Sequence, residues 1–92
     1  MLVKELAKTL GRFDIRINAL VPGAIAAGGF VADSALARHI PLGRLGKAED
    51  LAPIALAVLS NRISSYVTGA AVVVDGGLSL MNWFDPPDLG EL

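Results

Sequence analysis

The sequence has 92 residues, of which 53% are apolar and 18% are charged, and its formal net charge is −1. A chain of this length forms one domain at most and buries only about 60–65% of the surface that its unfolded form exposes. The balanced charge, with one Trp and one Tyr, excludes the basic surface of a nucleic-acid-binding protein, and the absence of cysteine excludes disulfides and thiolate chemistry.

The first expected element is a helix. Leu2, Leu6 and Leu10 recur every four residues, which is typical of an amphipathic helix over residues 2–11. Gly11 is expected to end it. Its charges interrupt the apolar residues, so the sequence predicts no signal peptide, and no apolar run is long enough to cross a membrane. We therefore expect a cytoplasmic protein with no membrane partner.

A strand is expected next, over residues 15–21, because β-branched residues alternate with other side chains there. Pro22 and Gly23 should end it, since Pro lacks a ladder donor and Gly permits a sharp turn. Residues 24–47 are expected to form a long excursion. Within it, ADSALARHI favours a short helix capped by Asp33 or Ser34, and PLGRLG is typical of a turn.

A second helix is expected over residues 47–60, apolar on most of its surface. Pro53 should make it start late or kink, because Pro forfeits an internal hydrogen bond at a cost of about 3 kcal/mol. Residues 61–69 are a polar connection, and residues 70–74 are a continuous apolar strand. That pattern indicates a parallel strand covered on both faces.

The order helix, strand, helix, strand predicts two parallel strands joined by a right-handed crossover. A two-stranded parallel sheet leaves both of its edges open and one of its faces uncovered. The sequence therefore predicts an α/β arrangement that is incomplete as a free domain.

Three segments match a known pattern in order and spacing. IRINALVPGAI resembles the segment I-R-V-N-A-V/I-x-P-G-x-I/V of the short-chain dehydrogenases/reductases. IPLGRLGKAEDLAPIALAVLS resembles the family's I-P-L-G-R-x-G-x-P-E-E/D-V/I-A helix, and SSYVTGAAVVVDGG resembles its ending S-x-Y-V/I-T-G-x-x-L/I/V-x-V-D-G-G. Residues 2–80 are thus similar to the C-terminal part of such a protein.

The resemblance implies that residues 1–92 are the C-terminal portion of one Rossmann-like domain. Helix 2–11 would end the long helix that starts with the family's Y-x-x-x-K motif, and the two strands would be the last of the parallel sheet. Residues 24–47 would form the substrate lobe, and residues 81–92 an irregular tail. The family usually forms dimers or tetramers, so we expect a homo-oligomer.

No residue of the chain is expected to be catalytic or to bind metal. The family transfers hydride with Ser, Tyr and Lys, but Tyr66 has Ala70 rather than Lys four residues later, so Tyr66 is interpreted as structural. The catalytic groups would lie upstream of Met1. The glycines Gly23, Gly28 and Gly29 lack the spacing of a phosphate-binding loop and follow a late strand.

One segment is expected to contact a cofactor, namely Pro22, Gly23, Ala24 and Ile25. By the resemblance, its backbone runs beside the nicotinamide of NAD or NADP, and the amide after P-G-x meets the carboxamide. Ligands bind at the carboxyl ends of such strands. The alternative is that Pro22 and Gly23 only terminate a strand. Ala27 stands where the family often has Thr, which predicts a weaker contact with the cofactor.

Other polar and aromatic residues are expected to serve the structure. Asn18 should satisfy backbone groups near the strand, and Asp75 should cap the turn that follows the last strand. His39 is interpreted as a surface or helix-end residue. Further lobe and tail residues could line a substrate pocket or anchor the tail on a neighbouring subunit: Phe30, Ile40, Trp83 and Phe84.

Three functions remain open at this point. The first is part of an NAD(P)-dependent oxidoreductase that acts on a small carbonyl or alcohol substrate and is inactive as the isolated chain. The second is a non-catalytic module that self-associates through apolar helices and open strand edges. The third is a complementing subunit that docks on a partner bearing the missing half. The sequence does not distinguish NAD from NADP or identify the substrate.

Overall fold

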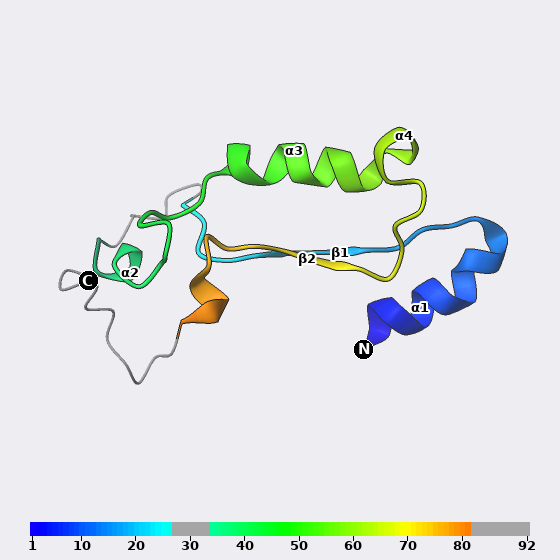
Figure 1. Cartoon of the computed structure of the whole chain (residues 1–92), viewed down its shortest axis with the longest axis horizontal. Coiled ribbons are helices and arrows are strands. Elements are labelled where there is room, and N and C mark those ends of the chain that lie inside the picture. The colour runs from blue at the N-terminus through cyan, green and yellow to red at the C-terminus, as the bar shows by residue number, and fades with distance from the viewer. Residues whose placement is uncertain (27–33, 82–92) are drawn as a thin grey trace.

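The computed structural model describes residues 1–26 and 34–81 (Figure 1). In chain order its elements are α1 (Leu2–Leu10), the 3-10 turn η1 (Gly11–Phe13), β1 (Ala19–Pro22), α2 (Ser34–Ala37), α3 (Ala48–Leu59), α4 (Asn61–Ser64), β2 (Ala71–Val74) and the 3-10 turn η2 (Leu78–Leu80). The expected order of helix, strand, helix, strand is confirmed, with four short helical elements between or after them: η1, α2, α4 and η2.

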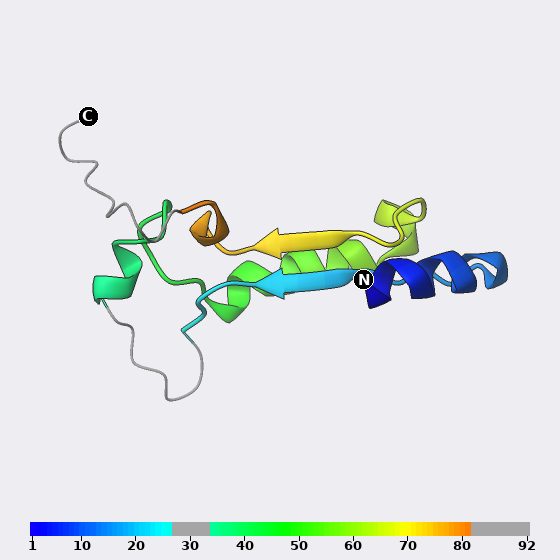
Figure 2. The same cartoon turned by 90° about the horizontal axis from the view of Figure 1, so that it is seen from below.

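The two strands pair in parallel, as the sequence predicts, with Ala19 opposite Ala71 and Pro22 opposite Val74. The helix α3 lies along one face of this pair, whereas α1 lies beyond the amino-terminal ends of the strands on the opposite side (Figures 1 and 2). The carboxyl ends of both strands point toward the end of the molecule that holds α2 and η2. This end carries the segment expected to contact a cofactor.

The start of β1 is later than expected. The ladder begins at Ala19 rather than at residue 15, because at Ile17 and Asn18 side-chain oxygens replace some of the backbone acceptors that a ladder would use. The N–H of Ile17 donates to Oγ1 of Thr68 at 3.1 Å, and Oδ1 of Asn18 accepts from the N–H of Ala70 at 3.0 Å. Nδ2 of Asn18 also donates to the Val67 carbonyl at 3.1 Å. The prediction that Asn18 satisfies backbone groups near the strand is therefore confirmed.

The α-helix α1 ends at Leu10 with Gly11 as its C-cap, as expected, but the chain does not turn away there. Gly11 has right-handed helical angles (φ −58°, ψ −33°), and the chain continues into η1. The left-handed residue that ends this turn is Asp14, with φ 60°. Asp is among the few non-glycine residues that adopt this conformation readily, which explains why the glycine is not needed there.

The late start expected for the second helix is wrong. The helix α3 begins at Ala48 and runs through Pro53 as one continuous element (Figure 1). Pro53 and Glu49 are both exposed, so water can solvate the Glu49 carbonyl that the missing Pro53 N–H would have bonded. The polar connection after α3 contains one further helical turn, α4, where Oγ of Ser60 accepts from the N–H of Ile63 at 3.3 Å.

The short helix expected in the lobe is present as α2. It begins at Ser34, which places Ser34 inside the helix rather than at its cap, while Asp33 lies outside the described residues. Phe30, Trp83, Phe84 and most of the tail also lie outside them.

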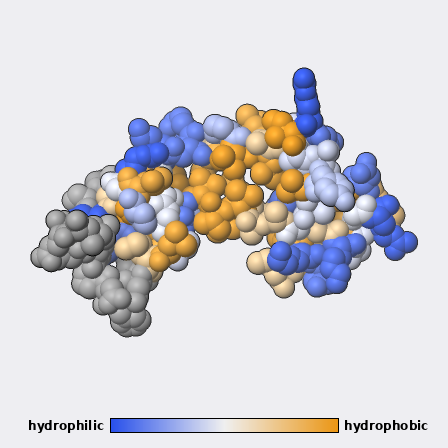
Figure 3. All heavy atoms as spheres, viewed as in Figure 1, coloured by the Kyte–Doolittle hydropathy of each residue, from blue (hydrophilic) through white to orange (hydrophobic). Residues whose placement is uncertain are grey.

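Apolar side chains are poorly covered in the described part of the chain. Only Ala7, Ile40 and Leu45 are buried apolar residues there. Figure 3 shows hydrophobic residues gathered on the surface over α3 and the strands. The residues of β2 alternate between exposed (Ala71, Val73) and half-buried (Val72, Val74), so only one face of the pair is covered. The described residues place no covering layer on the second face, as expected for a two-stranded sheet, although the apolar run 70–74 is typical of a strand covered on both faces.

Candidate functional site

The candidate site is the segment Pro22, Gly23, Ala24 and Ile25, called here the strand-end segment. Its first residue closes β1, and the N–H of Gly23 donates to the Val74 carbonyl at 3.1 Å. A Cβ on Gly23 would lie 2.5 Å from Cβ of Asp75 and 2.8 Å from its Cα. The two chain segments therefore come so close at the carboxyl edge of the sheet that only glycine fits at position 23.

The second half of the strand-end segment pairs with the turn before α3. Ile25 forms an isolated parallel bridge with Gly46. The N–H of Gly46 donates to the Ala24 carbonyl, and the N–H of Ala26 donates to the Gly46 carbonyl, both at 2.9 Å. A Cβ on Gly46 would lie 2.6 Å from Cδ1 of Ile25, so the Ile25 side chain packs directly on this glycine.

This bridge leaves the backbone of Ile25 available. Neighbouring peptide groups of an extended chain point in alternate directions, so bonds from Gly46 to Ala24 and Ala26 turn the Ile25 N–H and C=O to the opposite side. Neither group bonds to another described residue. The strand-end segment thus presents one donor and one acceptor side by side, the pair that a primary carboxamide needs.

Two hollows flank the strand-end segment. One of about 300 Å³ is lined in part by Ala24, Ile25 and the α3 residue Ile54. Another of about 360 Å³ lies against Pro22, Gly23 and Asp75. The segment therefore separates two concave surfaces at the carboxyl edge of the sheet, the place where open α/β sheets bind their ligands.

Asp75 fixes the turn that follows β2, as the sequence predicts. Its Oδ1 accepts from the N–H of Gly77 at 2.8 Å, and its Oδ2 accepts from the N–H of Ser79 at 2.9 Å. Hydrogen bonds from the Ser79 side chain and from these two N–H groups lower the pKa of Asp75 below its usual value. The carboxylate is therefore occupied in holding the turn.

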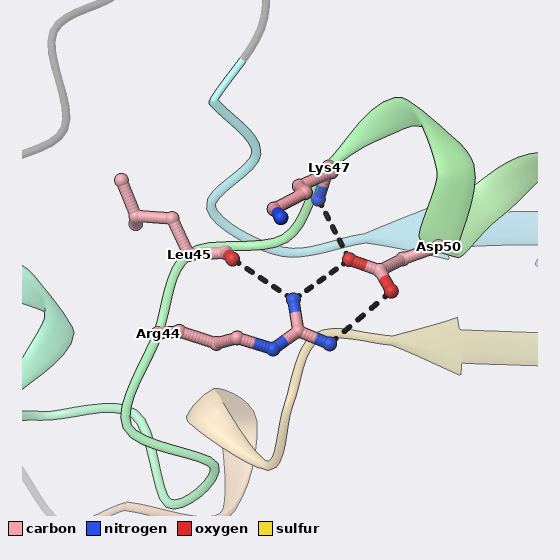
Figure 4. A network of polar contacts seen from close by, with 4 residues as sticks. All are labelled: Arg44, Leu45, Lys47 and Asp50. Atoms are coloured by element: carbon pink, nitrogen blue, oxygen red, sulfur yellow. Dashed lines mark hydrogen bonds and ion pairs between the residues drawn. The ribbon is translucent and has the colours of Figure 1, made fainter.

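A network that the sequence analysis missed holds the turn before α3 (Figure 4). The Arg44 guanidinium binds Asp50 through its two terminal nitrogens, at 2.8 Å from Nη1 to Oδ2 and 3.2 Å from Nη2 to Oδ1. Nη1 also donates to the Leu45 carbonyl at 3.2 Å, and Oδ2 of Asp50 accepts from the N–H of Lys47 at 2.8 Å. The Arg44 bonds, followed by the Lys47 bond, lower the pKa of Asp50 to about 2.

The sequence held a signal for this network. Asp50 stands three residues after the cap residue Lys47, the spacing at which an acidic side chain reaches back to the N-cap N–H. The PLGRLG segment by itself predicts a turn and does not indicate which acceptor Arg44 reaches. Only the fold shows that this acceptor is Asp50 and that Gly46 between them touches Ile25.

The remaining candidates lie away from the strand-end segment or outside the described residues. Tyr66 is fully exposed in the connection after α4, and its interpretation as structural stays untested. Ile40 is buried, so it packs inside the lobe. Ala27, Gly28 and Gly29 lie outside the described residues. Among residues 1–26 and 34–81, no cluster of His, Cys, Asp or Glu could hold a metal ion, and no helix has the length and apolar character to cross a bilayer.

A parallel strand pair with a helical crossover and a glycine-containing turn at its carboxyl edge places the chain in the class of open α/β sheets. Comparison with known families identifies the member of this class. The family model described as enoyl-(acyl carrier protein) reductase matches residues 1–79. The chain belongs to the short-chain dehydrogenase/reductase family.

Its relatives are oxidoreductases. The chain is 41% identical over 80 residues to a cyclohexanol dehydrogenase from Rhodococcus sp. strain TK6, a match that covers 80% of this chain and 29% of the relative. It is 41% identical over 85 residues to an L-rhamnose 1-dehydrogenase (NAD(P)(+)) from Azotobacter vinelandii, covering 84% of this chain and 32% of the relative.

The fold agrees with these matches. A short-chain dehydrogenase from Bacillus anthracis superposes with a TM-score of 0.78 at 36% identity, over 89% of this chain and 34% of that protein. The expected fold, part of a Rossmann-like parallel sheet, is confirmed. The chain spans about a third of the length of the relatives that it matches.

Proposed function

We propose that this chain supplies the nicotinamide end of the cofactor site in an NAD(P)-dependent oxidoreductase that interconverts a small carbonyl compound and an alcohol. The observation that carries the proposal is the free donor and acceptor of Ile25 at the carboxyl edge of the sheet. When bound, the nicotinamide ring gives or takes the hydride. The name of the Azotobacter relative, an NAD(P)(+) dehydrogenase, supports this choice of cofactor.

The role of the chain's own residues is to bind and orient. The Ile25 N–H would donate to the carboxamide oxygen and the Ile25 C=O would accept from its nitrogen, which fixes the face of the ring that meets the substrate. Pro22 and Gly23 bring the backbone to the edge of the sheet. Neither Tyr66 nor any other described residue is assigned to proton transfer, so we propose that the isolated chain has no turnover.

The experiment is a chimera in which the chain replaces the matching segment of the Rhodococcus cyclohexanol dehydrogenase. The proposal expects the chimera to bind NADH or NADPH, measured by quenching of protein fluorescence, and to oxidise cyclohexanol. The isolated chain should oxidise neither cofactor with a panel of ketones. A chimera that unfolds cooperatively but binds neither cofactor, or turnover by the isolated chain, would contradict the proposal.

A second function is favoured by exposed side chains on α3 and α4. Leu56, Leu59 and Ile63 are each about 70% exposed, and the first two lie three residues apart on one face of the helix. Large apolar patches mark association surfaces. We therefore include a homo-oligomer in the proposal, with a non-catalytic self-associating module as the alternative if the chimera does not bind cofactor. A cytoplasmic location is part of the same proposal, and fractionation of cells that produce the tagged chain tests it.

A further inference from the structure

The position of the Ile25 backbone depends on Gly46, because the two bonds that surround Ile25 both come from that one residue. The Gly46 N–H donates to the Ala24 carbonyl, and the Gly46 carbonyl accepts from the Ala26 N–H, both at 2.9 Å. Movement of Gly46 would therefore carry the strand-end segment with it. The contacts that hold Gly46 in place therefore also decide where the strand-end segment lies.

In the chain, Gly46 stands between Leu45 and Lys47, two of the residues in the network of Figure 4. On its amino-terminal side, the Arg44 guanidinium binds the Leu45 carbonyl and Asp50. On its carboxyl-terminal side, the N–H of Lys47 donates to the same Asp50 carboxylate. Gly46 has no side chain of its own to hold it, and Asp50 belongs to the first turn of α3. The ion pair between Arg44 and Asp50 thus joins the turn that contains Gly46 to the first turn of α3.

The two-nitrogen geometry gives this contact a defined orientation. A guanidinium that meets a carboxylate through two nearly parallel hydrogen bonds fixes the plane as well as the distance. The Arg44 side chain is 53% exposed and the Asp50 side chain 34% exposed, and both line the hollow that Ile25 also lines. An ion pair this exposed contributes little to global stability. Its effect is therefore local.

We propose that Arg44 and Asp50 are positioning residues for cofactor binding, and that they act by holding Gly46 against the strand-end segment so that the Ile25 N–H and C=O face the carboxamide. The identity of the ligand rests on the proposed function. The positioning itself rests on the contacts of Arg44, Asp50 and Gly46.

The first test measures the position of the segment without any cofactor. Amide hydrogen exchange is followed by NMR in the full chain and in Arg44→Gln. The Gly46 and Ala26 amides, which form the bridge, should exchange at least about tenfold faster in the variant, since local opening frees them. The Ala19 amide, bonded to Ala70 in the sheet, should keep its rate. Equal rates at Gly46 and Ala26 in both proteins would overturn the proposal.

Arg62→Gln is the matched control. Arg62 is an exposed arginine on α4, and the same substitution there removes the same charge without touching the turn before α3. It should leave every one of these exchange rates unchanged. Asp50→Asn retains an oxygen that can accept from the Lys47 N–H but loses the ionic contact with Arg44. It should give an intermediate rate at Gly46, whereas a wild-type rate would show that the ionic contact between Arg44 and Asp50 is not needed.

The second test measures affinity in the chimera described above. Arg44→Gln should raise the Kd for NADH by roughly tenfold and the Km for cofactor in parallel, with a smaller change in kcat. Arg44→Lys should restore only part of the affinity, because an ammonium cannot form the two parallel bonds. An unchanged Kd in Arg44→Gln would overturn the positioning role. If the unmodified chimera binds no cofactor while the exchange rates still respond, the proposed function fails, and the role of Arg44 in positioning the segment through Gly46 stands.

Discussion

The guanidinium of Arg16 binds the carbonyl oxygens of Val58 and Leu59, at 2.9 and 3.1 Å, and so joins the residues that lead into β1 to the last turn of α3. A helix leaves its final carbonyls without internal partners, and a cation there is also favoured by the helix dipole. The same side chain reaches Oδ1 of Asn61 and the carbonyl of Val67, both at 3.1 Å. Four acceptors from three segments therefore converge on one arginine.

Replacement of this arginine should destabilise the chain. Arg16→Met retains much of the side chain's apolar length but removes all four bonds, so we expect a loss of about 2 kcal/mol in the free energy of unfolding, the value typical of hydrogen bonds to a charged group. Urea unfolding followed by circular dichroism measures it. Arg38→Met, a change at an exposed arginine in the lobe, should shift the midpoint very little. Equal midpoints for the two variants would contradict the role of Arg16.

Two glycines should respond in opposite directions to alanine. Gly23→Ala places a Cβ within 2.5 Å of Asp75, and the backbone must shift, at about 1–3 kcal/mol. Gly11→Ala meets nothing within 4 Å and keeps helical angles, so it should stabilise the chain by about 0.5–1 kcal/mol. Thermal unfolding of the two variants checks both signs in one experiment. A stabilising Gly23→Ala would show that the strand ends are further apart than described.

The contact between Gly46 and Ile25 can be tested by compensation. Gly46→Ala brings a methyl group to 2.6 Å from Cδ1 of Ile25, and that end of a flexible side chain must move. Ile25→Val removes Cδ1, so the double variant should recover the exchange protection at the Ala26 amide that Gly46→Ala loses. Hydrogen exchange of the two single variants and the double variant measures this coupling. Additive effects would mean that the two residues do not touch.

Asp50 should make a small contribution to the loss of stability in acid, small because the Arg44–Asp50 pair is exposed. Its pKa lies at about 2 in the folded chain and near 3.8 without these contacts, so its contribution is fully present above about pH 4. The contribution is lost as the pH falls from about 4 toward 2, because the proton then binds the unfolded form more tightly. A titration of the Asp50 carboxyl by NMR should show a midpoint near 2. In Arg44→Gln, which removes the largest cause, the midpoint should rise toward 3.8.

Association should depend on the exposed leucines of α3. The double variant Leu56→Glu and Leu59→Glu places two charges on the face of the helix that is exposed in the single chain. If this face joins copies of the chain, the variant should sediment as a monomer at concentrations where the unmodified chain is larger. Leu80→Glu on η2, also an exposed leucine, is the matched control and should leave the sedimentation unchanged. An unchanged oligomer in the double variant would exclude this face.

The expectations that the structure confirmed come from local patterns. The four-residue spacing of Leu2, Leu6 and Leu10 predicts a helix because 3.6 residues make one turn, and β-branched residues near Val21 predict a strand. Asp75 is two residues from the amide of Gly77, so its capping bond is visible in the sequence itself. The order of the elements predicted the parallel pairing of the two strands, and the family resemblance identified the larger Rossmann-like sheet to which they belong.

What the sequence alone determined about this protein is the type and order of its elements, because backbone periodicity and bonds between near neighbours are written in adjacent residues. The tertiary structure decided where β1 begins, since Asn18 supplies a side-chain acceptor to Ala70, 52 residues away. It also decided that Gly46 lies against Ile25 and that Arg44 holds this turn on α3. Such contacts depend on how distant segments approach one another, and no local spacing encodes that distance.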